Sequence, residues 1–182
     1  MNDTEITLRV FEPRDSEKVI DFFTRLSENT IRNYTRFGFP LDIDSVKKHL
    51  SWVTESGSEM EKIFIAIVGD KVVGLGHLTF FQKTWKKHVC TLGIVIEDGW
   101  QGKGIGKSIM NYMISFAKQK GIKKVWLSVY ADNLRARQLY EKMGFVVEGI
   151  FINEEIFGGV ARHVISMALF LDETYKPDKT TG

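Results

Sequence analysis

The stretch that most constrains this chain is an apolar segment that runs directly into a glycine-rich turn. Residues 92–96 read Leu-Gly-Ile-Val-Ile, a short apolar run typical of a buried strand. Glu97-Asp98-Gly99 then has the composition of a turn, and residues 101–106, Gln-Gly-Lys-Gly-Ile-Gly, open an amphipathic helical pattern. A glycine-rich loop at a helix N-terminus brings backbone amides and the helix dipole close to an anion. We therefore expect a phosphate or pyrophosphate here.

Several interpretations of this loop compete. A P-loop requires Gly-x-x-x-x-Gly-Lys-Ser; Gly106-Lys107-Ser108 supplies its end, but Gln101 stands where the first glycine is needed. A dinucleotide fingerprint, Gly-x-Gly-x-x-Gly, fits two glycines and then meets Lys107. A turn and helix cap that binds nothing is the simplest alternative. The pattern that fits is Gln-x-x-Gly-x-Gly, formed by Gln101, Gly104 and Gly106.

This pattern resembles the acyl-CoA pyrophosphate loop of the GNAT N-acetyltransferase superfamily. A second segment, residues 125–145, carries the same resemblance: a strand pattern, then Asn133, a short helical stretch that contains Tyr140, and a Gly-Phe pair. The resemblance extends from residue 6 to residue 170 and is strongest over residues 92–149. Because two separate motifs occur in the family's order, a chance match is disfavoured.

Periodicity along the rest of the chain predicts alternating strands and helices. Strands are expected near residues 6–10, 63–68, 72–81, 92–96, 125–129, 145–153 and 160–170, and helices near 15–26, 44–55, 105–120 and 134–143. Gly74 and Gly76 share one strand face, where a close approach is expected. The order resembles the GNAT fold of the α/β class: a mixed, mostly antiparallel sheet of about seven strands, helices on both faces, and a splay between strands 4 and 5.

Length and composition bound the remaining possibilities. The 182 residues fit a single N-acetyltransferase domain over residues 1–171, followed by a polar tail over 172–182. A formal charge of +2 predicts no large basic surface for nucleic acid. No apolar run has membrane-spanning length and no signal peptide is evident, so we expect a cytoplasmic protein without a membrane partner. The single Cys90 is more typical of a core residue than of a nucleophile.

The resemblance implies a set of acetyl-CoA-binding residues and no metal. The backbone of the fourth strand would hold the pantetheine arm through Ile94, Val95 and Ile96. The loop amides would hold the pyrophosphate, through Gln101, Gly102, Lys103, Gly104, Ile105, Gly106 and Lys107. The side chains of Lys103 and Lys107 would either add positive charge or be ordinary surface lysines.

Two residues after the fifth strand would take part in the chemistry, again by resemblance. Tyr140 would act as the general acid that protonates the departing thiolate and would also contact the cofactor; its alternative is a core aromatic residue. Asn133 would contact the pantetheine or the acetyl region; its alternative is a helix N-cap. The implied reaction is direct transfer of an acetyl group from acetyl-CoA to a primary amine.

The acceptor amine must be neutral to attack, and no residue is identified as its base. Some histone-type family members have a Glu in the fourth strand, where this chain has residues 88–91, His-Val-Cys-Thr; others have a Glu five residues before the Asn, where it has Ser128. Open candidates are His77, a solvated Glu97, Glu148, Glu154, Glu155 and a water chain. Neutralising a lysine or polyamine amine costs about 4 kcal/mol near neutral pH, against about 1 kcal/mol for an α-amine. The missing base therefore favours an α-amine.

The acceptor is left open among a protein N-terminal or lysine amine, a polyamine and an amino acid. Residues 27–40 and 148–163 would form its walls by resemblance, although the aromatic residues and arginines of 27–40 could equally be a packed connection. A homodimer is compatible with this architecture. The alternative to an enzyme is a non-catalytic acyl-CoA-binding regulatory module on the same fold.

Overall fold

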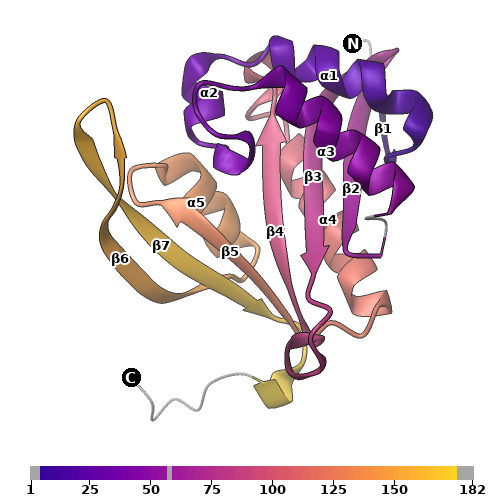
Figure 1. The fold of residues 1–182 in the computed structure, drawn as a ribbon. Coiled ribbons are helices and arrows are strands. Elements are labelled where there is room, and N and C mark those ends of the chain that lie inside the picture. Colours follow the sequence, from indigo (N-terminus) through magenta and orange to yellow (C-terminus); the bar gives the residue numbers. More distant parts are fainter. Residues whose placement is uncertain (1–4, 57–58, 176–182) are drawn as a thin grey trace. The chain divides into compact units, whose positions relative to one another are not determined.

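The computed structural model describes residues 5–56 and 59–175 (Figure 1). Within them the strands are β1 (Ile6–Val10), β2 (Glu61–Val68), β3 (Lys71–Phe80), β4 (Val89–Ile96), β5 (Lys124–Tyr130), β6 (Val146–Phe157) and β7 (Val160–Phe170). The α-helices are α1 (Ser16–Thr24), α2 (Glu28–Arg32), α3 (Ile43–Glu55), α4 (Ile105–Gln119) and α5 (Leu134–Lys142). Short 3-10 turns are η1 (Pro13–Asp15), η2 (Thr35–Phe37), η3 (Thr84–Lys86), η4 (Asp98–Trp100) and η5 (Glu173–Tyr175).

Contacts divide the chain into two compact units. The first comprises Met1–Phe80 and Gly93–Ile114, and the second Phe81–Leu92 and Ser115–Gly182. Strand pairing follows the order β1-β2-β3-β4 in the first unit and β4-β5-β7-β6 in the second, with β4 contributing to both. The resulting seven-stranded sheet is mostly antiparallel, which confirms the predicted class of fold. The splay between β4 and β5 and the single N-acetyltransferase domain stay predictions.

Helices cover both faces of the sheet in the first unit. On one face a Cβ atom added to Gly74 would lie 2.9 Å from Cδ1 of Ile109 in α4. One added to Gly76 would lie 2.7 Å from Sδ of Met113, so the predicted close approach is that of α4. The other face carries Leu75, which joins an apolar cluster with residues of α1, α3 and β2: Phe22, Phe23, Val46, Leu50, Ile63 and Ile65.

The second unit is built on β5, β6, β7 and the first residues of β4. Val89, Cys90 and Thr91 of β4 pair in parallel with β5, opposite Lys124, Val125 and Trp126. The β5–β7 and β6–β7 pairs are antiparallel. Side chains reinforce the β5–β7 pair, since Nε1 of Trp126 donates a hydrogen bond of 2.6 Å to Oγ of Ser166. The first turn of the expected tail, η5, places the Tyr175 ring 5.3 Å from that of His88; residues 176–182 lie outside the described part.

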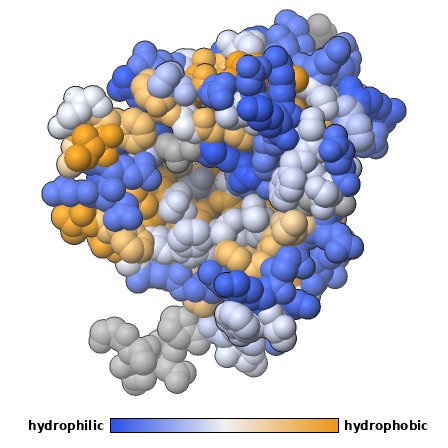
Figure 2. All heavy atoms as spheres, in the orientation of Figure 1, coloured by the Kyte–Doolittle hydropathy of each residue, from blue (hydrophilic) through white to orange (hydrophobic). Residues whose placement is uncertain are grey.

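Strand β6 is the last strand in the sheet order, and it is longer than predicted. It runs to Phe157 rather than ending near Asn153. Asn153 has a positive φ of 55° and lies inside a register shift between Phe151 and Glu155, after which the pairing with β7 resumes. Figure 2 shows apolar residues gathered on this hairpin. The exposed members are Ile150, Phe151, Ile152, Ile156 and Val160, which are 48–70 % exposed. A homodimer stays a prediction.

Two features depart from the predicted elements. Residues 27–40, which follow neither period, contain α2 and η2. These elements are five and three residues long, too short to produce a repeating apolar pattern. Asp15, at the start of the helix expected over residues 15–26, stands at the N-cap position of α1 but does not cap it with its side chain. Its carboxylate accepts hydrogen bonds from Arg9 and from the N–H of Glu12. In the part of the chain that the structure describes, we find no helix with the length and apolar character needed to cross a membrane.

Candidate acetyl-CoA site

The turn between β4 and α4 is fixed to the N-terminus of α2 by Asp98. Its carboxylate accepts hydrogen bonds from the Ser27 N–H at 3.0 Å, the Ser27 hydroxyl at 2.7 Å and the Thr30 hydroxyl at 2.8 Å. Burial raises the pKa of Asp98, but the hydrogen bonds from Ser27 and Thr30 outweigh it and hold the pKa below its usual range. The turn is therefore held by a charged acceptor with several donors.

Gln101 continues this attachment. Its side-chain Nε2 donates to the Thr30 hydroxyl at 3.1 Å and to the Ile96 carbonyl at 3.1 Å. Its backbone N–H donates to the Asp98 carbonyl at 3.3 Å. Gln101, expected among the amides that hold the pyrophosphate, therefore also positions the loop, and its contact with the pyrophosphate stays a prediction.

The next residues present a row of backbone donors. Gly102 and Gly104 have positive φ values of 81° and 84°, a conformation that favours glycine. The first bond of α4 runs from the Ser108 N–H to the Gly104 carbonyl at 3.1 Å, so the N–H groups of residues 105–107 precede it. Ile105 is 1 % exposed and anchors the turn. A helix N-terminus with these donors fits a diphosphate.

The lysines and β4 residues of the predicted site are also placed by these elements. Lys103 and Lys107 are exposed, and Nζ of Lys103 lies 4.5 Å from the centre of the Trp100 ring. Val95 is 4 % exposed and joins the apolar cluster, whereas Ile96 faces Gly74 on the α4 side. The side chains of Val95 and Ile96 pack on opposite faces of the sheet. The groups of this part of β4 that could bind a ligand are therefore those of the main chain.

In the second unit, Asn133 and Tyr140 belong to the start and the body of α5. Asn133 is the N-cap, and its Oδ1 accepts a hydrogen bond of 3.2 Å from the Ala136 N–H, as its alternative role requires. Tyr140 is 7 % exposed and its ring centre lies 5.8 Å from that of Phe145. Burial raises the pKa of Tyr140 to about 12, so the phenol carries its proton at neutral pH. Within residues 5–56 and 59–175 its hydroxyl has no hydrogen-bond partner.

Cys90 is a buried core residue, as predicted. It is fully shielded in β4, and burial raises the pKa of its thiol to about 12, which disfavours the thiolate form that a nucleophile needs. No group of three or more His, Cys, Asp or Glu side chains among the described residues is arranged to hold a metal ion.

Most of the acidic base candidates have partners. Glu97, expected to be solvated, is 19 % exposed and its Oε1 lies 3.1 Å from Nε of Arg25. Glu148 pairs with Lys124, and Glu155 accepts a hydrogen bond from the Tyr130 hydroxyl. These carboxylates serve ion pairs and hydrogen bonds in the present structure, so none stands out as a base.

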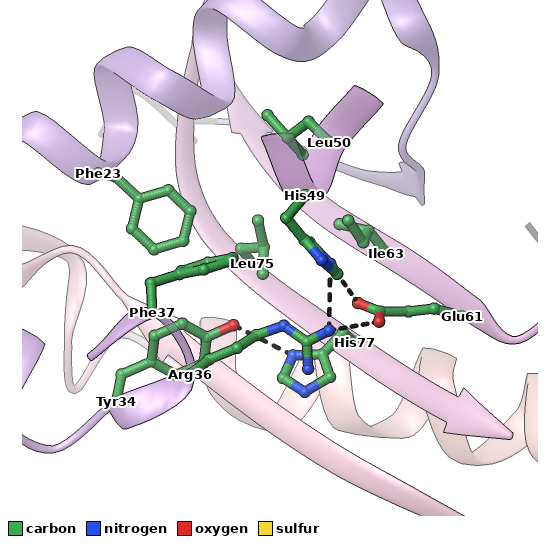
Figure 3. A pocket seen from close by; sticks show the side chains of 10 residues that line it. All are labelled: Phe23, Tyr34, Arg36, Phe37, His49, Leu50, Glu61, Ile63, Leu75 and His77. Atoms are coloured by element: carbon green, nitrogen blue, oxygen red, sulfur yellow. Dashed lines mark hydrogen bonds and ion pairs between the residues drawn. The ribbon is translucent and has the colours of Figure 1, made fainter. Parts of the chain in front are cut away.

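His77 lies instead in a pocket of the first unit that the sequence did not predict. Figure 3 shows this pocket, which we call the Arg36 pocket. Its empty space of about 200 Å³ includes the solvent at its open side. Its lining residues come from five parts of the chain: Phe23, Tyr34, Arg36, Phe37, His49, Leu50, Glu61, Ile63, Leu75 and His77. Arg36 and Glu61 form an ion pair, His49 lies 3.1 Å from each of them, and the Tyr34 hydroxyl lies 3.1 Å from Nδ1 of His77.

One signal could have revealed this pocket. Glu61 is in phase with the inward-facing residues Ile63 and Ile65 of β2, and it is 2 % exposed. A carboxylate on the apolar side of a strand requires a buried partner, because an unpaired buried charge is strongly unfavourable. The sequence does not show which residue supplies that partner.

Comparisons with known proteins agree with the two motifs. The family model described as "Acetyltransferase (GNAT) family" matches residues 21–145. The L-amino acid N-acetyltransferase AaaT of Escherichia coli is 31 % identical over 93 residues, 50 % of this chain and 56 % of that protein. The spermidine N(1)-acetyltransferase of Escherichia coli is 32 % identical over 128 residues, 68 % of this chain and 66 % of that protein.

Among solved structures, yncA from Salmonella typhimurium, determined with its cofactor acetyl-CoA, covers 96 % of this chain and 98 % of its own. It has a TM-score of 0.78 at 18 % identity, which establishes the shared fold. The resemblance drawn from the Gln-x-x-Gly-x-Gly loop is thus confirmed. The chain belongs to the GNAT family of acetyltransferases.

Proposed function

We propose that this protein transfers an acetyl group from acetyl-CoA directly to a primary amine. The observation that carries this proposal is the row of main-chain donors over residues 102–107, which leads into the first bond of α4. The diphosphate of acetyl-CoA would accept hydrogen bonds from these donors. The pantetheine arm would pair with the main chain of Ile94, Val95 and Ile96.

The reaction needs one bond to form and one to break. The neutral amine attacks the thioester carbonyl, a C–N bond forms, and the C–S bond breaks to release a thiolate. The amine then gives up its surplus proton to a base or to water. Tyr140 donates its phenolic proton to the sulfur, so that CoA leaves as a thiol. The Tyr140 phenolate then regains a proton from the base or water that took the proton of the amine.

The acidity of the two groups is compatible with this step. In water a phenol has a pKa of about 10 and a thiol about 8.5, so the transfer to a thiolate is uphill. Burial raises the pKa of both kinds of group in this protein: to about 12 for the Tyr140 phenol and to about 12 for the Cys90 thiol. A thiolate shielded from water would likewise become more basic, which makes the proton transfer less uphill than it is in water.

A thiol-release assay combined with calorimetric CoA binding tests the proposal. Acetyl-CoA would be supplied with four acceptor classes: L-amino acids, spermidine, peptides with a free α-amine, and lysine peptides with a blocked α-amine. We expect free thiol to appear only with an acceptor, together with an equal amount of acetylated amine detected by mass spectrometry. Tight CoA binding without acetylation of any class would overturn the transferase and favour a regulatory acyl-CoA-binding module.

A further inference from the structure

We propose that the Arg36 pocket binds the carboxylate of the acceptor, so that the acceptor is a small amine of the α-amino-acid type. This inference rests on the proposed acetyl transfer and adds the class of substrate. The relatives leave this class open, because one is named for L-amino acids and the other for spermidine. The choice is argued from the charged groups of the pocket.

The first argument is that the carboxylate of Glu61 already has partners within the protein. Glu61 is 2 % exposed; one of its carboxylate oxygens pairs with Arg36, and the other lies 3.1 Å from Nε2 of His49 (Figure 3). An acceptor ammonium would have to displace one of these partners and would meet the positive charge of Arg36. A polyamine is therefore disfavoured as the occupant.

The second argument is that the Arg36 guanidinium uses only one of its nitrogen atoms to contact the protein. Arg36 is 22 % exposed, and its contacts with Glu61 and His49 both use Nη2. Over residues 5–56 and 59–175, Nε and Nη1 of Arg36 donate to no protein acceptor. Nη2 belongs to both paired edges of the guanidinium, so Nε and Nη1 can each donate a single, charge-assisted hydrogen bond. Arg36 therefore keeps two donors that a carboxylate of the acceptor could use.

The third argument places the pocket beside the proposed thioester strand. A Cβ atom added to Gly93 would lie 2.2 Å from Cε1 of His77, so the His77 ring packs directly against the β4 main chain. Gly93 immediately precedes Ile94, the first residue proposed to pair with the pantetheine arm. In an α-amino acid the amine and the carboxylate share one carbon atom. A carboxylate on Arg36 would therefore keep the amine near His77 and this part of β4.

Two further properties of the pocket agree with such an occupant. Burial, helped by the charges of Arg36 and His49, holds the pKa of His77 well below its usual range, so the ring next to the amine is uncharged. The wall opposite the polar groups is apolar and includes Phe23 and Phe37, whose ring centres are 5.3 Å apart.

Calorimetry with matched ligands tests the inference on the wild-type protein saturated with CoA. Each of several apolar L-amino acids would be compared with its amide, which keeps the α-amine and loses the carboxylate. We expect at least one amino acid to bind about tenfold or more tightly than its amide, as expected for a charge-assisted carboxylate contact. Equal binding within every pair would overturn the inference, and this comparison needs no variant.

Two variants then assign the effect to Arg36. Arg36→Gln should remove the discrimination between acid and amide, whereas Arg32→Gln should keep it. Arg32 is a matched control, because it is 44 % exposed, pairs with Glu28 and lies in the same segment. Thermal unfolding of each variant would verify folding, since Arg36→Gln removes a partner of Glu61. Discrimination that persists in a folded Arg36→Gln protein would contradict the role of Arg36.

Turnover separates this inference from the proposed function. If spermidine or amino-acid amides are acetylated as well as the amino acids, the transferase stands and the carboxylate site falls. If an amino acid binds in an Arg36-dependent way and no acceptor is acetylated, the site stands and the transferase falls. Acetylation of amino acids that depends on Arg36 mainly through KM supports both.

Discussion

The first unit contains two sets of hydrogen-bond donors suited to anions, and they are built in opposite ways. The loop over residues 102–107 uses consecutive main-chain N–H groups, shaped by Gly102 and Gly104 at positive φ. The Arg36 pocket uses one side chain that is fixed by residues from α3 and β2. Main-chain donors recognise a diphosphate whatever else it is attached to, whereas a fixed guanidinium selects for one planar group. The difference suggests a general donor site for the shared cosubstrate and a specific site for the acceptor.

The largest expected effect concerns a residue that belongs to neither set. Tyr140→Phe should lower kcat by about 100-fold or more, the usual contribution of a general acid, because the phenyl ring cannot protonate the thiolate. CoA affinity should not change, since the Tyr140 hydroxyl has no partner to lose among the described residues. Steady-state rates and calorimetry on the same preparation measure both. Tyr112→Phe is a control, because Tyr112 is 41 % exposed on α4. Equal kcat values for wild type and Tyr140→Phe would remove the acid role.

The same contrast explains what the sequence could predict. The loop is contiguous, so its strand, glycines and helix start are visible as a pattern, and the predicted donors lie where α4 begins. The pattern places Gln101 among the donors but gives no sign of its N–H bond to the Asp98 carbonyl, because that bond depends on the fold of the turn. Sequence spacing does not report which of two adjacent amides is already used.

The Arg36 pocket could not be predicted in this way. Its ionisable residues include Arg36 in η2, His49 in α3 and Glu61 in β2, and they meet only after α3 packs on the sheet. The segment that carries Arg36 shows no periodicity, because α2 and η2 are short. A functional site made from distant short elements leaves only local signals, such as a carboxylate in phase with buried strand residues.

The second prediction separates backbone conformation from crowding in the loop. Gly104→Ala should weaken CoA binding by roughly tenfold, because a non-glycine residue at this φ costs about 1–2 kcal/mol and a methyl group would stand where the diphosphate approaches. A Cβ at Gly104 meets no protein atom within 4 Å, so any loss would not come from a clash inside the protein.

Gly99→Ala provides the matched control. A Cβ at Gly99 also meets no protein atom within 4 Å, and its φ is outside the positive range. Calorimetric Kd values should therefore show near-normal CoA binding for Gly99→Ala. If both variants bind CoA like the wild type, the loop does not hold the diphosphate and the comparison of two anion sites fails.

The third prediction uses pH to probe the pocket without a ligand. The pKa of His77 is lowered by burial and by the charges of Arg36 and His49, so unfolding lets the ring take up a proton below pH ~6.5. The stability associated with neutral His77 is complete above that value and is lost as pH falls below it, by up to about 1.4 kcal/mol per pH unit. Urea unfolding at pH 7.0, 6.0 and 5.0 would measure the slope.

His77→Gln should make this slope shallower, because glutamine does not titrate. Asp15 and Asp98 do not interfere, since their pKa values are lowered from 3.8 and they titrate at more acidic pH. His163→Gln is a control, because His163 lies on β7 of the second unit, where Nδ1 accepts a hydrogen bond from the Asn153 N–H. A wild-type slope in His77→Gln would mean that folding does not lower the pKa of His77.

The smallest expected effect tests how the loop is held in place. Asp98→Asn removes the charge that accepts bonds from Ser27 and Thr30, and we expect a loss of about 1 kcal/mol in unfolding free energy, the usual scale for one hydrogen bond at a partly solvated site. CoA affinity should fall by less than in Gly104→Ala, because the donors themselves remain. Asp44→Asn, at an exposed position on α3, should change neither quantity. If Asp98→Asn weakens CoA binding more than Gly104→Ala does, attachment of the turn to α2, rather than the local glycine conformation, determines how well the main-chain donors bind the diphosphate.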